Sequence, residues 1–219
     1  MQPEFWHERW RTGQIGFHQS TVSRSLRSHW SALGLASPSC RVFVPLCGKS
    51  LDLLWLREQG HFVTGVEISP TALESFFLEN GIPARRRMFA GFDVYEAANL
   101  ELFRGDFFAL TPELIGEVAA IYDRAALISW APELRGAYAA HLAELSPRGA
   151  RMLLVTLDYP QPQMPGPPFS LSSEELAGLF APHFALEEIA RADILAGEAR
   201  LRAKGVTRLA EVCYQLVRR

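Results

Sequence analysis

Gly48 and Glu67 are the residues whose types and spacing point most directly to chemistry, and they are 19 positions apart. Gly48 follows the apolar run Val42–Val44, and Glu67 lies near the end of a second apolar run, residues 61–68. A strand, a glycine turn, a helix and a strand that ends on an acid form the nucleotide-binding half of a doubly wound sheet. There, backbone N–H groups at the turn and a carboxylate bind the ligand, the carboxylate through ribose hydroxyls. The pattern therefore predicts a site for a ligand that contains a nucleoside.

The turn at Gly48 differs from the usual dinucleotide fingerprint, which has three glycines where this turn has one. Pro45 and Leu46 before it leave less room for a pyrophosphate against the backbone. A ligand with adenosine and no phosphates fits better, and S-adenosylmethionine is the obvious candidate. The same residues are equally compatible with an ordinary β–α turn in which Glu67 is a solvated strand end.

Two further predicted strand ends carry polar residues. Leu100–Arg104 is expected to be the third strand, and Asp106 follows it. The fourth strand, residues 118–122, is followed by Asp123 and Arg124. Because the strands of a doubly wound sheet end at one crevice, Asp106 is a candidate acceptor for an adenine amino group. An aspartate in an ordinary turn explains Asp106 equally well.

The first 19 residues are rich in aromatic side chains, whereas terminal segments are usually polar. Trp6 and Trp10 are four positions apart and therefore share one face of a helical turn. Gly13 and Gly16 would let the backbone fold over a ligand. Residues 1–19, the N-terminal aromatic segment, are thus predicted to form a lid; the alternative is a helix that simply packs on the domain. The aromatic residues are Phe5, Trp6, Trp10 and Phe17.

Length and composition indicate a single α/β domain over residues 1–219. Lys+Arg of 22 against Asp+Glu of 24 gives a net charge of −2, so no nucleic-acid partner is expected. No apolar run approaches the ~20 residues of a membrane span, and the first residues lack the features of a secretory signal. Cys40, Cys47 and Cys213 have neither disulfide nor metal-ligand spacing, so no metal is expected. The expected location is the cytoplasm, and the expected assembly state is a monomer.

Helices and strands alternate along the rest of the chain, as in a doubly wound sheet. Residues 82–99, which include Arg85–Arg87, are interpreted as a solvated connection with some strand character. Tyr159–Phe169 holds five prolines and is predicted to form a shaped loop over the site. Further helices are expected at 20–35, 70–80, 132–145 and 173–180, and further strands at 151–157, 184–194 and 211–217.

Several specific motifs occur in order along essentially the whole chain. Two of them are far more specific than a lone glycine motif: Pro45-Leu46-Cys47-Gly48-Lys49 and Pro165-Gly166-Pro167-Pro168-Phe169. The others are Trp6-x3-Trp10-x6-Phe17-His18-Gln19, Gly65-Val66-Glu67-Ile68-Ser69 and Asp123-Arg124-x-Ala126-Leu127. Together these motifs resemble the thiopurine S-methyltransferase family, most strongly its bacterial branch.

The resemblance implies a class I methyltransferase fold: a three-layer α/β/α arrangement around a doubly wound, seven-stranded, mostly parallel sheet whose last strand is inserted antiparallel. It also implies S-adenosylmethionine as the cofactor and S-adenosylhomocysteine as its product. Ala125 departs mildly from the glycine of the family's vertebrate members. By motif position, the implied cofactor-binding residues are Trp6, Trp10, Leu46, Gly48, Glu67, Asp106, Phe107 and Arg124. Phe17 and Arg200 are the implied substrate-binding residues, and Arg124 and Arg200 the implied catalytic residues.

The activity that the resemblance implies is methyl transfer to the sulfur of an aromatic or heterocyclic thiol, with selenium and tellurium compounds as further substrates in detoxification. Alignment and desolvation can contribute ~7–11 kcal/mol to such a displacement, and an acidic thiol needs no dedicated base. Arg124 and Arg200 would favour the thiolate, unless Arg124 is a structural ion-pair member. A cation–π contact of Trp10 with the sulfonium of the cofactor would contribute ~0.5–2 kcal/mol to cofactor binding.

Other functions remain open at this point. One is a small-thiol or halide methyltransferase of the same fold. Another is a non-catalytic S-adenosylmethionine-binding protein, although that function would not require the aromatic segment and the arginines. A nicotinamide oxidoreductase would share the first strand–turn–helix–strand unit, but the missing glycines disfavour it.

Overall fold

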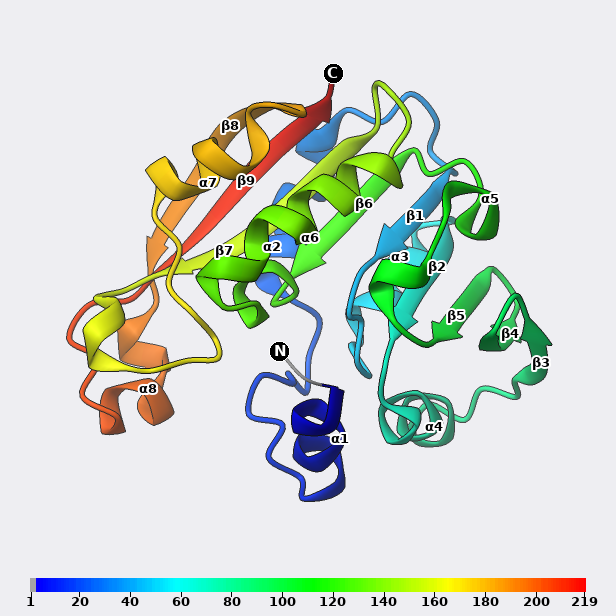
Figure 1. The fold of residues 1–219 in the computed structure, drawn as a ribbon, viewed down its shortest axis with the longest axis horizontal. Helices are drawn as coiled ribbons and strands as arrows, with labels where there is room; N and C mark the ends of the chain where they lie inside the picture. Colours follow the sequence, from blue (N-terminus) through cyan, green and yellow to red (C-terminus); the bar gives the residue numbers. More distant parts are fainter. Residues whose placement is uncertain (1–2) are drawn as a thin grey trace.

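A nine-stranded sheet forms the centre of the computed structural model, which describes residues 3–219. The strands follow the order β3-β4-β5-β2-β1-β6-β7-β9-β8 across the sheet (Figure 1). Their bounds are β1 Arg41–Val44, β2 Phe62–Glu67, β3 Arg85–Phe89, β4 Phe92–Ala97, β5 Leu100–Arg104, β6 Ala120–Arg124, β7 Arg151–Asp158, β8 Phe184–Asp193 and β9 Ala210–Arg218.

The central strands β5, β2, β1, β6 and β7 pair in parallel, as in a doubly wound sheet. The last strand, β9, is inserted antiparallel between β7 and β8. The doubly wound fold and the inserted last strand are therefore confirmed. The fourth strand runs from Ala120 to Arg124 and so includes the two polar residues that the sequence analysis placed after it.

The expected strand count of seven is wrong, because residues 82–99 form two additional strands rather than a connection. β3 and β4 form an antiparallel hairpin that extends the sheet beyond β5. Ala90 and Gly91, which join the two strands, both have positive φ, at 48° and 85°. Two such residues are the geometry that joins tightly paired strands. The arginine run Arg85–Arg87 thus lies in an edge strand.

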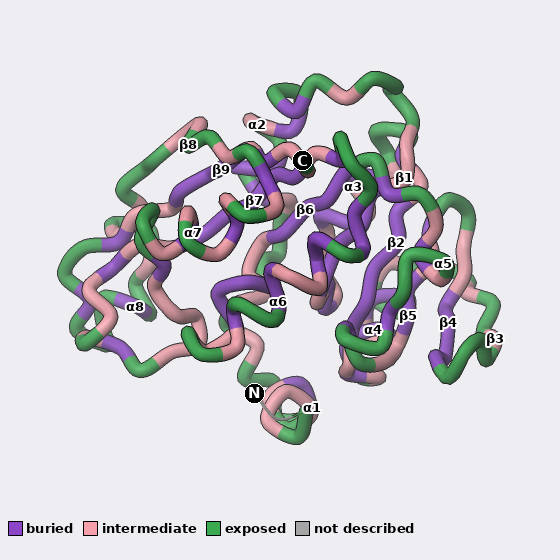
Figure 2. The backbone as a smooth tube through the Cα atoms, turned by 45° about the horizontal axis from the view of Figure 1, so that its top comes forward, coloured by how far each residue is buried: buried purple, intermediate pink, exposed green. Residues whose placement is uncertain are grey.

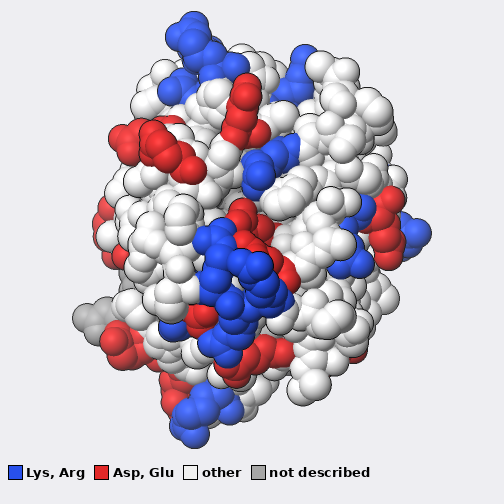
Figure 3. All heavy atoms as spheres, turned by 90° about the vertical axis from the view of Figure 1, so that its right-hand side faces the viewer, with Lys and Arg blue, Asp and Glu red and all other residues white. Residues whose placement is uncertain are grey.

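Acidic partners surround the arginines of this hairpin. Arg86 pairs with Asp93 at 2.5 Å, and Arg87 contacts both Glu96 and Glu101. Figure 3, which faces this side of the molecule, shows basic and acidic side chains next to each other. The pairs are partly exposed, so each contributes little to stability.

Helices cover both faces of the sheet, so the expected three-layer α/β/α arrangement is confirmed. The core on one face contains residues of α6 and α7 packed on Phe43, and the core on the other contains residues of α2, α3 and α4 packed on Val42 and Val44. The strands between them are largely buried (Figure 2). The helices are α1 Pro3–Arg11, α2 Arg24–His29, α3 Asp52–Glu58, α4 Pro70–Glu79, α5 Pro112–Ile115, α6 Pro132–Glu144, α7 Ser173–Phe180 and α8 Ala199–Ala203.

The predicted start of α4 is confirmed, whereas the predicted start of α2 is wrong. Ser69 accepts a hydrogen bond from the Ala72 N–H at 3.3 Å, and Pro70 is the first residue of α4, as predicted. The helix expected over residues 20–35 is shorter, because α2 begins only after Ser23, its N-cap. A short 3-10 helix, Trp30–Leu33, completes that segment.

α1 lies apart from the sheet, on the side toward which β1 and β6 point (Figure 1). The gap between α1 and the sheet is where the site described below is found. No helix within residues 3–219 is long and apolar enough to cross a membrane. The same residues contain no group of three or more His, Cys, Asp or Glu side chains that could hold a metal ion.

Candidate active site

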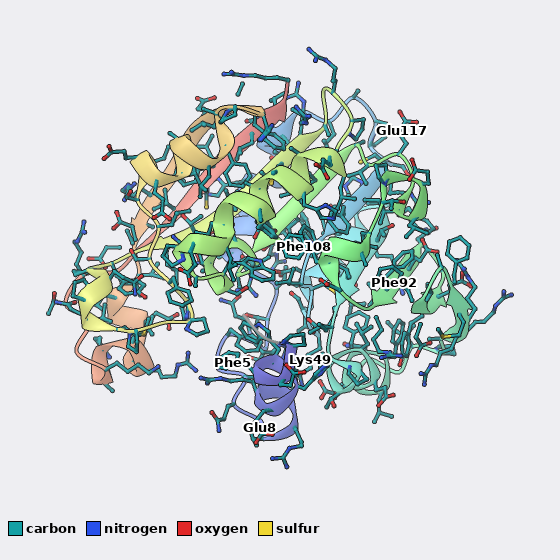
Figure 4. The ribbon with its side chains drawn as sticks, viewed as in Figure 1. Phe5, Glu8, Lys49, Phe92, Phe108 and Glu117 are labelled. Carbon is teal, nitrogen blue, oxygen red and sulfur yellow. The ribbon has the colours of Figure 1, made fainter. Side chains whose placement is uncertain are left out.

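A cavity of about 380 Å³ lies where β1, β2, β5 and β6 end, between these strand ends and α1. Its size is within the usual range for small-molecule sites. Phe108 and Lys49, which both line it, face the region between the sheet and α1 in Figure 4. All the residues that the sequence analysis assigned to the site line this one cavity: Trp6, Trp10, Phe17, Leu46, Gly48, Glu67, Asp106, Phe107, Arg124 and Arg200. The role of each toward a ligand stays a prediction.

The turn after β1 needs Gly48 for two reasons. Its φ of 55° is in the left-handed region that favours glycine. In addition, a Cβ at Gly48 would lie 3.1 Å from Cζ2 of Trp10. The indole of Trp10 therefore packs closely against the glycine turn and closes the cavity from the α1 side.

Glu67 is buried at the end of β2, so the interpretation of this residue as a solvated strand end is wrong. Its carboxylate accepts hydrogen bonds from the Gly48 N–H at 3.0 Å and from the Ser69 N–H at 2.7 Å. Burial raises the pKa of Glu67 to about 7, against the lowering effect of these backbone bonds. The two bonds fix the carboxylate, whose remaining lone pairs can accept from a ligand.

Asp106 is a turn aspartate that also lines the cavity, and its role as an acceptor for adenine stays a prediction. Its Oδ1 accepts from the Phe108 N–H at 3.0 Å, so Asp106 caps the short 3-10 helix Phe107–Ala109. It is also exposed to the cavity that it lines. Phe107 is buried and stacks on Tyr138 at 4.9 Å between ring centroids, which fixes this part of the wall.

Arg124 lines the cavity and also belongs to a structural ion pair. Its Nε donates to Oδ2 of Asp52 at 3.1 Å. Asp52, at the start of α3, also accepts from the Tyr122 hydroxyl at 2.9 Å and from the Ser23 N–H at 2.8 Å. Asp52 could not be identified from the sequence, since its partners are distant along the chain.

The N-terminal aromatic segment is held together by edge-to-face ring contacts. Phe17 lies between Trp6 and Trp10, with ring centroids 5.7 Å and 5.6 Å away. Trp6 also contacts Phe5 at 5.1 Å. Only Trp10 of these is buried, and none of them belongs to the sheet's core. Trp6, Trp10 and Phe17 form a wall of the cavity.

Arg200, in α8, reaches the same segment from the C-terminal half of the chain. A Cβ at Gly16 would lie 1.4 Å from Nη1 of Arg200, so the guanidinium occupies the space that a side chain at Gly16 would fill. The two segments therefore meet beside the cavity, with Arg200 between them.

Several residues on this side of the cavity were missed, namely Phe108, Trp130, Leu134 and Lys204. Trp130 is notable because its buried Nε1 has no hydrogen-bond partner within residues 3–219. An aromatic residue a few positions after the end of β6 was a signal that could have identified it. Pro167 and Pro168 also line the cavity, as predicted for the proline-rich loop.

Solved structures of methyltransferases share this fold. One is a SAM-dependent methyltransferase from Anabaena variabilis, with a TM-score of 0.67 and 17% sequence identity over 99% of this chain and 95% of the other. Another is Burkholderia thailandensis 1,6-didemethyltoxoflavin-N1-methyltransferase, solved with S-adenosylhomocysteine bound, with a TM-score of 0.60 and 17% identity over 97% of this chain and 86% of the other. The fold is thus that of the class I methyltransferases, with the β3–β4 hairpin added.

Sequence relatives are much closer. A thiopurine S-methyltransferase of Methylococcus capsulatus is 49% identical over 99% of this chain and 97% of its own length. One of Pseudomonas fluorescens is 48% identical over the whole of both chains. The family described as "Thiopurine S-methyltransferase (TPMT)" matches residues 1–219. The chain belongs to the thiopurine S-methyltransferase family.

Proposed function

We propose that this protein transfers a methyl group from S-adenosylmethionine to the sulfur of aromatic or heterocyclic thiols. The observation that carries this proposal is the fixed carboxylate of Glu67. It is bonded to the Gly48 N–H in a cavity that is also lined by the aromatic rings of Trp6, Trp10 and Phe17. Membership of the family, over the whole chain, supports the same reaction.

The residues present fit an adenosine-containing sulfonium compound. Glu67 would accept from both ribose hydroxyls, and Asp106 and Phe107 would hold the adenine. Trp10 and the other aromatic rings suit a cation, which the face of an indole attracts. When bound, S-adenosylmethionine supplies a methyl group already activated for displacement.

The protein's own contribution is to align the thiol and to exclude water. The N-terminal aromatic segment covers the cavity, and such positioning can contribute about 7–11 kcal/mol. The positive charges of Arg124 and Arg200 would favour the thiolate, which is the nucleophilic form. An acidic thiol therefore needs no general base from the protein.

The experiment begins with calorimetric titration by S-adenosylhomocysteine and, separately, by NAD. We expect S-adenosylhomocysteine to bind and NAD not to bind. A nicotinamide oxidoreductase would show the opposite result. In a second step, a thiopurine is incubated with the protein and S-adenosylmethionine, and mass spectrometry detects the methylated product. Binding without turnover of any thiol or halide would mean a non-catalytic binding protein, and turnover of small thiols or halides alone would favour the alternative methyltransferase.

The natural substrate is a further part of the proposal. We propose that aromatic thiols are the main class and that selenium and tellurium compounds are also methylated. A panel of thiols, selenols and metalloid oxyanions, followed by cofactor turnover, tests this directly. Equal inactivity of all selenium and tellurium compounds would remove the detoxification role.

We also propose a monomeric cytoplasmic enzyme. All three cysteines are free, as is usual in a reducing compartment. Within residues 3–219, the large exposed hydrophobic side chains are Leu78, Met88, Phe89 and Phe108, of which the last lines the cavity. Light scattering after size-exclusion chromatography tests the assembly state, and a mass near 49 kDa, twice the chain mass of 24.5 kDa, would contradict a monomer.

A further inference from the structure

Given the proposed methyl transfer, we propose that Asp52 is a positioning residue that holds Arg124 and sets the strength of its charge in the cavity. Asp52 does not line the cavity, whereas Arg124 does. The link between them is the 3.1 Å hydrogen bond from Nε of Arg124 to Oδ2 of Asp52.

Both charges of this pair are largely removed from water. Asp52 has a relative exposure of 1%, and the side chain of Arg124 has 14%. A charge in such surroundings is tolerated only with a partner and with its hydrogen bonds satisfied. Asp52 meets this condition with three donors, one on Oδ1 and two on Oδ2, which fix its orientation.

The bond at Nε leaves the other end of the guanidinium available. Within residues 3–219, the hydrogen bonds of Arg124 include none from Nη1 or Nη2. Because the residue lines the cavity, these N–H groups are the part of Arg124 that a bound thiolate or cofactor can meet. Asp52 therefore orients the arginine through Nε, and Nη1 and Nη2 stay available to a ligand.

The carboxylate also moderates the charge of Arg124. A negative group 3.1 Å from the guanidinium reduces the positive potential that reaches the cavity. The Tyr122 hydroxyl, which donates to the same oxygen, in turn reduces the negative charge that Asp52 presents to Arg124. The preference of the site for a thiolate over a thiol is thus set by Asp52 and Tyr122 together with Arg124.

The same carboxylate connects the site to the base of the N-terminal aromatic segment. Ser23, whose N–H donates to Oδ1 of Asp52, is the N-cap of α2 and lies four positions after the end of that segment. The position of Arg124 and the point at which the segment joins the domain are therefore fixed by one side chain.

The first test is the pH dependence of kcat for Asp52→Asn with an aromatic thiol at saturating cofactor. Asparagine keeps an oxygen for Arg124 and Tyr122 but removes the charge, together with the acceptor of the Ser23 N–H, so the site becomes more positive. We expect the acid limb of the profile to move to lower pH by about 0.5 unit or more. An unmoved limb, or a move to higher pH, would overturn the charge role.

Asp123→Asn is the matched control. Asp123 is also fully buried, and it also accepts from a tyrosine hydroxyl, Tyr138 at 2.7 Å, and from a backbone N–H, Leu127 at 3.1 Å. It has no hydrogen bond to an arginine among residues 3–219. Its substitution should lower stability without moving the acid limb. An equal shift in both variants would mean a general effect of lost buried charge.

Tyr122→Phe tests the same charge if Asp52→Asn does not fold. It removes a donor from Asp52 while the carboxylate stays, so Arg124 is neutralised more fully. The acid limb should then move to higher pH, opposite to the shift for Asp52→Asn. An unmoved limb or a shift to lower pH would overturn the inference.

The positioning role can be decided without turnover, from the NMR signal of the Arg124 side-chain Nε–Hε group in the wild-type protein. We expect slow hydrogen exchange of this group in the wild type and fast exchange in Asp52→Ala. Fast exchange in the wild type would overturn the positioning role. If no thiol is turned over by the wild type, the proposed methyl transfer fails while this measurement still stands.

Discussion

At the scale of single residues, the two backbone hydrogen bonds to Glu67 do not offset its burial. With a pKa raised by burial to about 7, this carboxyl is protonated in a large share of ligand-free molecules near neutral pH. A ribose that donates two hydroxyls requires the ionised form. If Glu67 binds the ribose as proposed, cofactor binding and deprotonation of Glu67 are linked.

We expect the affinity for S-adenosylhomocysteine to rise roughly tenfold between pH 6 and pH 8, as the ionised fraction of Glu67 rises. Binding at pH 7 should also release protons, which calorimetry in buffers of different ionisation enthalpy measures. Glu67→Gln serves as the control and should bind with a weak, pH-independent affinity. An affinity that is flat with pH in the wild type would contradict the linkage.

The Glu67→Ala variant removes the acceptor altogether. Two ribose hydroxyls would lose a charged partner, at a cost of about 1.5–3 kcal/mol, or at least tenfold in affinity. Titration with S-adenosylhomocysteine measures the change, and circular dichroism checks that the fold is intact. Unchanged affinity would remove Glu67 from the site.

Arg200 is expected to favour the thiolate, so Arg200→Ala should raise the apparent pKa in the pH profile of turnover. The sign is opposite to that expected for Asp52→Asn. Gly16→Ala is an independent route to the same result, because a methyl group there would collide with Nη1 of Arg200 and displace it. Two unmoved profiles with full turnover would exclude this role.

Site residues could be predicted from the sequence only where they lie in short motifs with recognisable spacing. Gly48, Glu67, Trp6, Trp10 and Phe17 lie in short motifs, and all of them line the cavity. Asp52 could not be found in this way, because its donors Ser23 and Tyr122 are 29 and 70 positions away. Only the packing of α3 against β6 and the start of α2 brings these groups together.

At the scale of elements, the N-terminal aromatic segment lines the cavity but contributes no strand to the sheet. Its rings contact each other and the glycine turn, and the sheet's first strand begins only at Arg41. Residues 1–19 are therefore expected to be dispensable for folding but not for cofactor binding.

Hydrogen exchange of residues 5–18, with and without S-adenosylhomocysteine, tests whether this segment is a lid. A lid that orders on binding should gain protection, because its backbone becomes less accessible when the rings close on the ligand. Equal protection in both states would identify a fixed wall. Deletion of residues 1–19 is the complementary test, and aggregation of the shortened protein would mean that Trp6 and Trp10 belong to the core.

Arg135 joins α6 to the segment before it, to the end of the proline-rich loop and to α7. It is fully buried in α6, and it donates to the carbonyls of Trp130 at 3.1 Å and Ser170 at 3.0 Å and to Glu175 of α7. We expect Arg135→Met to lower the free energy of unfolding by about 2–4 kcal/mol, because two carbonyls lose their donor. Urea denaturation measures this.

Arg191 is the control for that substitution. It also binds acidic partners, Asp158 and Glu188, but on the exposed surface. Arg191→Met should cost about 1 kcal/mol or less. Equal losses for the two variants would mean that burial of Arg135 is not what matters.

The β3–β4 hairpin shows why some elements escaped prediction. Arg85–Arg87 looked like a solvated connection because an edge strand with charged side chains lacks the apolar alternation of a buried strand. The helix predicted over residues 20–35 starts only after Ser23, and serine occurs at both position 20 and position 23, so residue type alone does not distinguish the two starts. In both cases tertiary pairing decided between similar local signals.

At the scale of the whole molecule, the order of the strands could be predicted only through the family resemblance, since pattern and length do not specify which strands are neighbours. The two-faced core, by contrast, follows from the sequence itself. Strands such as Val42–Val44 are apolar at every position and must be covered on both faces.

Stability of the ligand-free protein should depend on pH through Glu67. Its pKa in the folded protein is raised from 4.5 to about 7. Its contribution to the free energy of unfolding is therefore fully present below pH 4.5 and is lost as the pH rises to about 7, by an amount on the order of 3 kcal/mol. Urea midpoints from pH 5 to pH 8 should fall more steeply for the wild type than for Glu67→Gln. Parallel curves would contradict this expectation.

The placement of the two chain ends has a practical consequence for anyone who produces this protein. Pro3 lines the cavity, whereas the C-terminal strand β9 ends on the far side of the sheet (Figure 1). An affinity tag fused ahead of Met1 would start two residues from the cavity wall and could compete with ligands or prop the aromatic segment open. A tag after Arg219, or complete removal of an N-terminal tag, avoids this interference with the binding and turnover measurements described above.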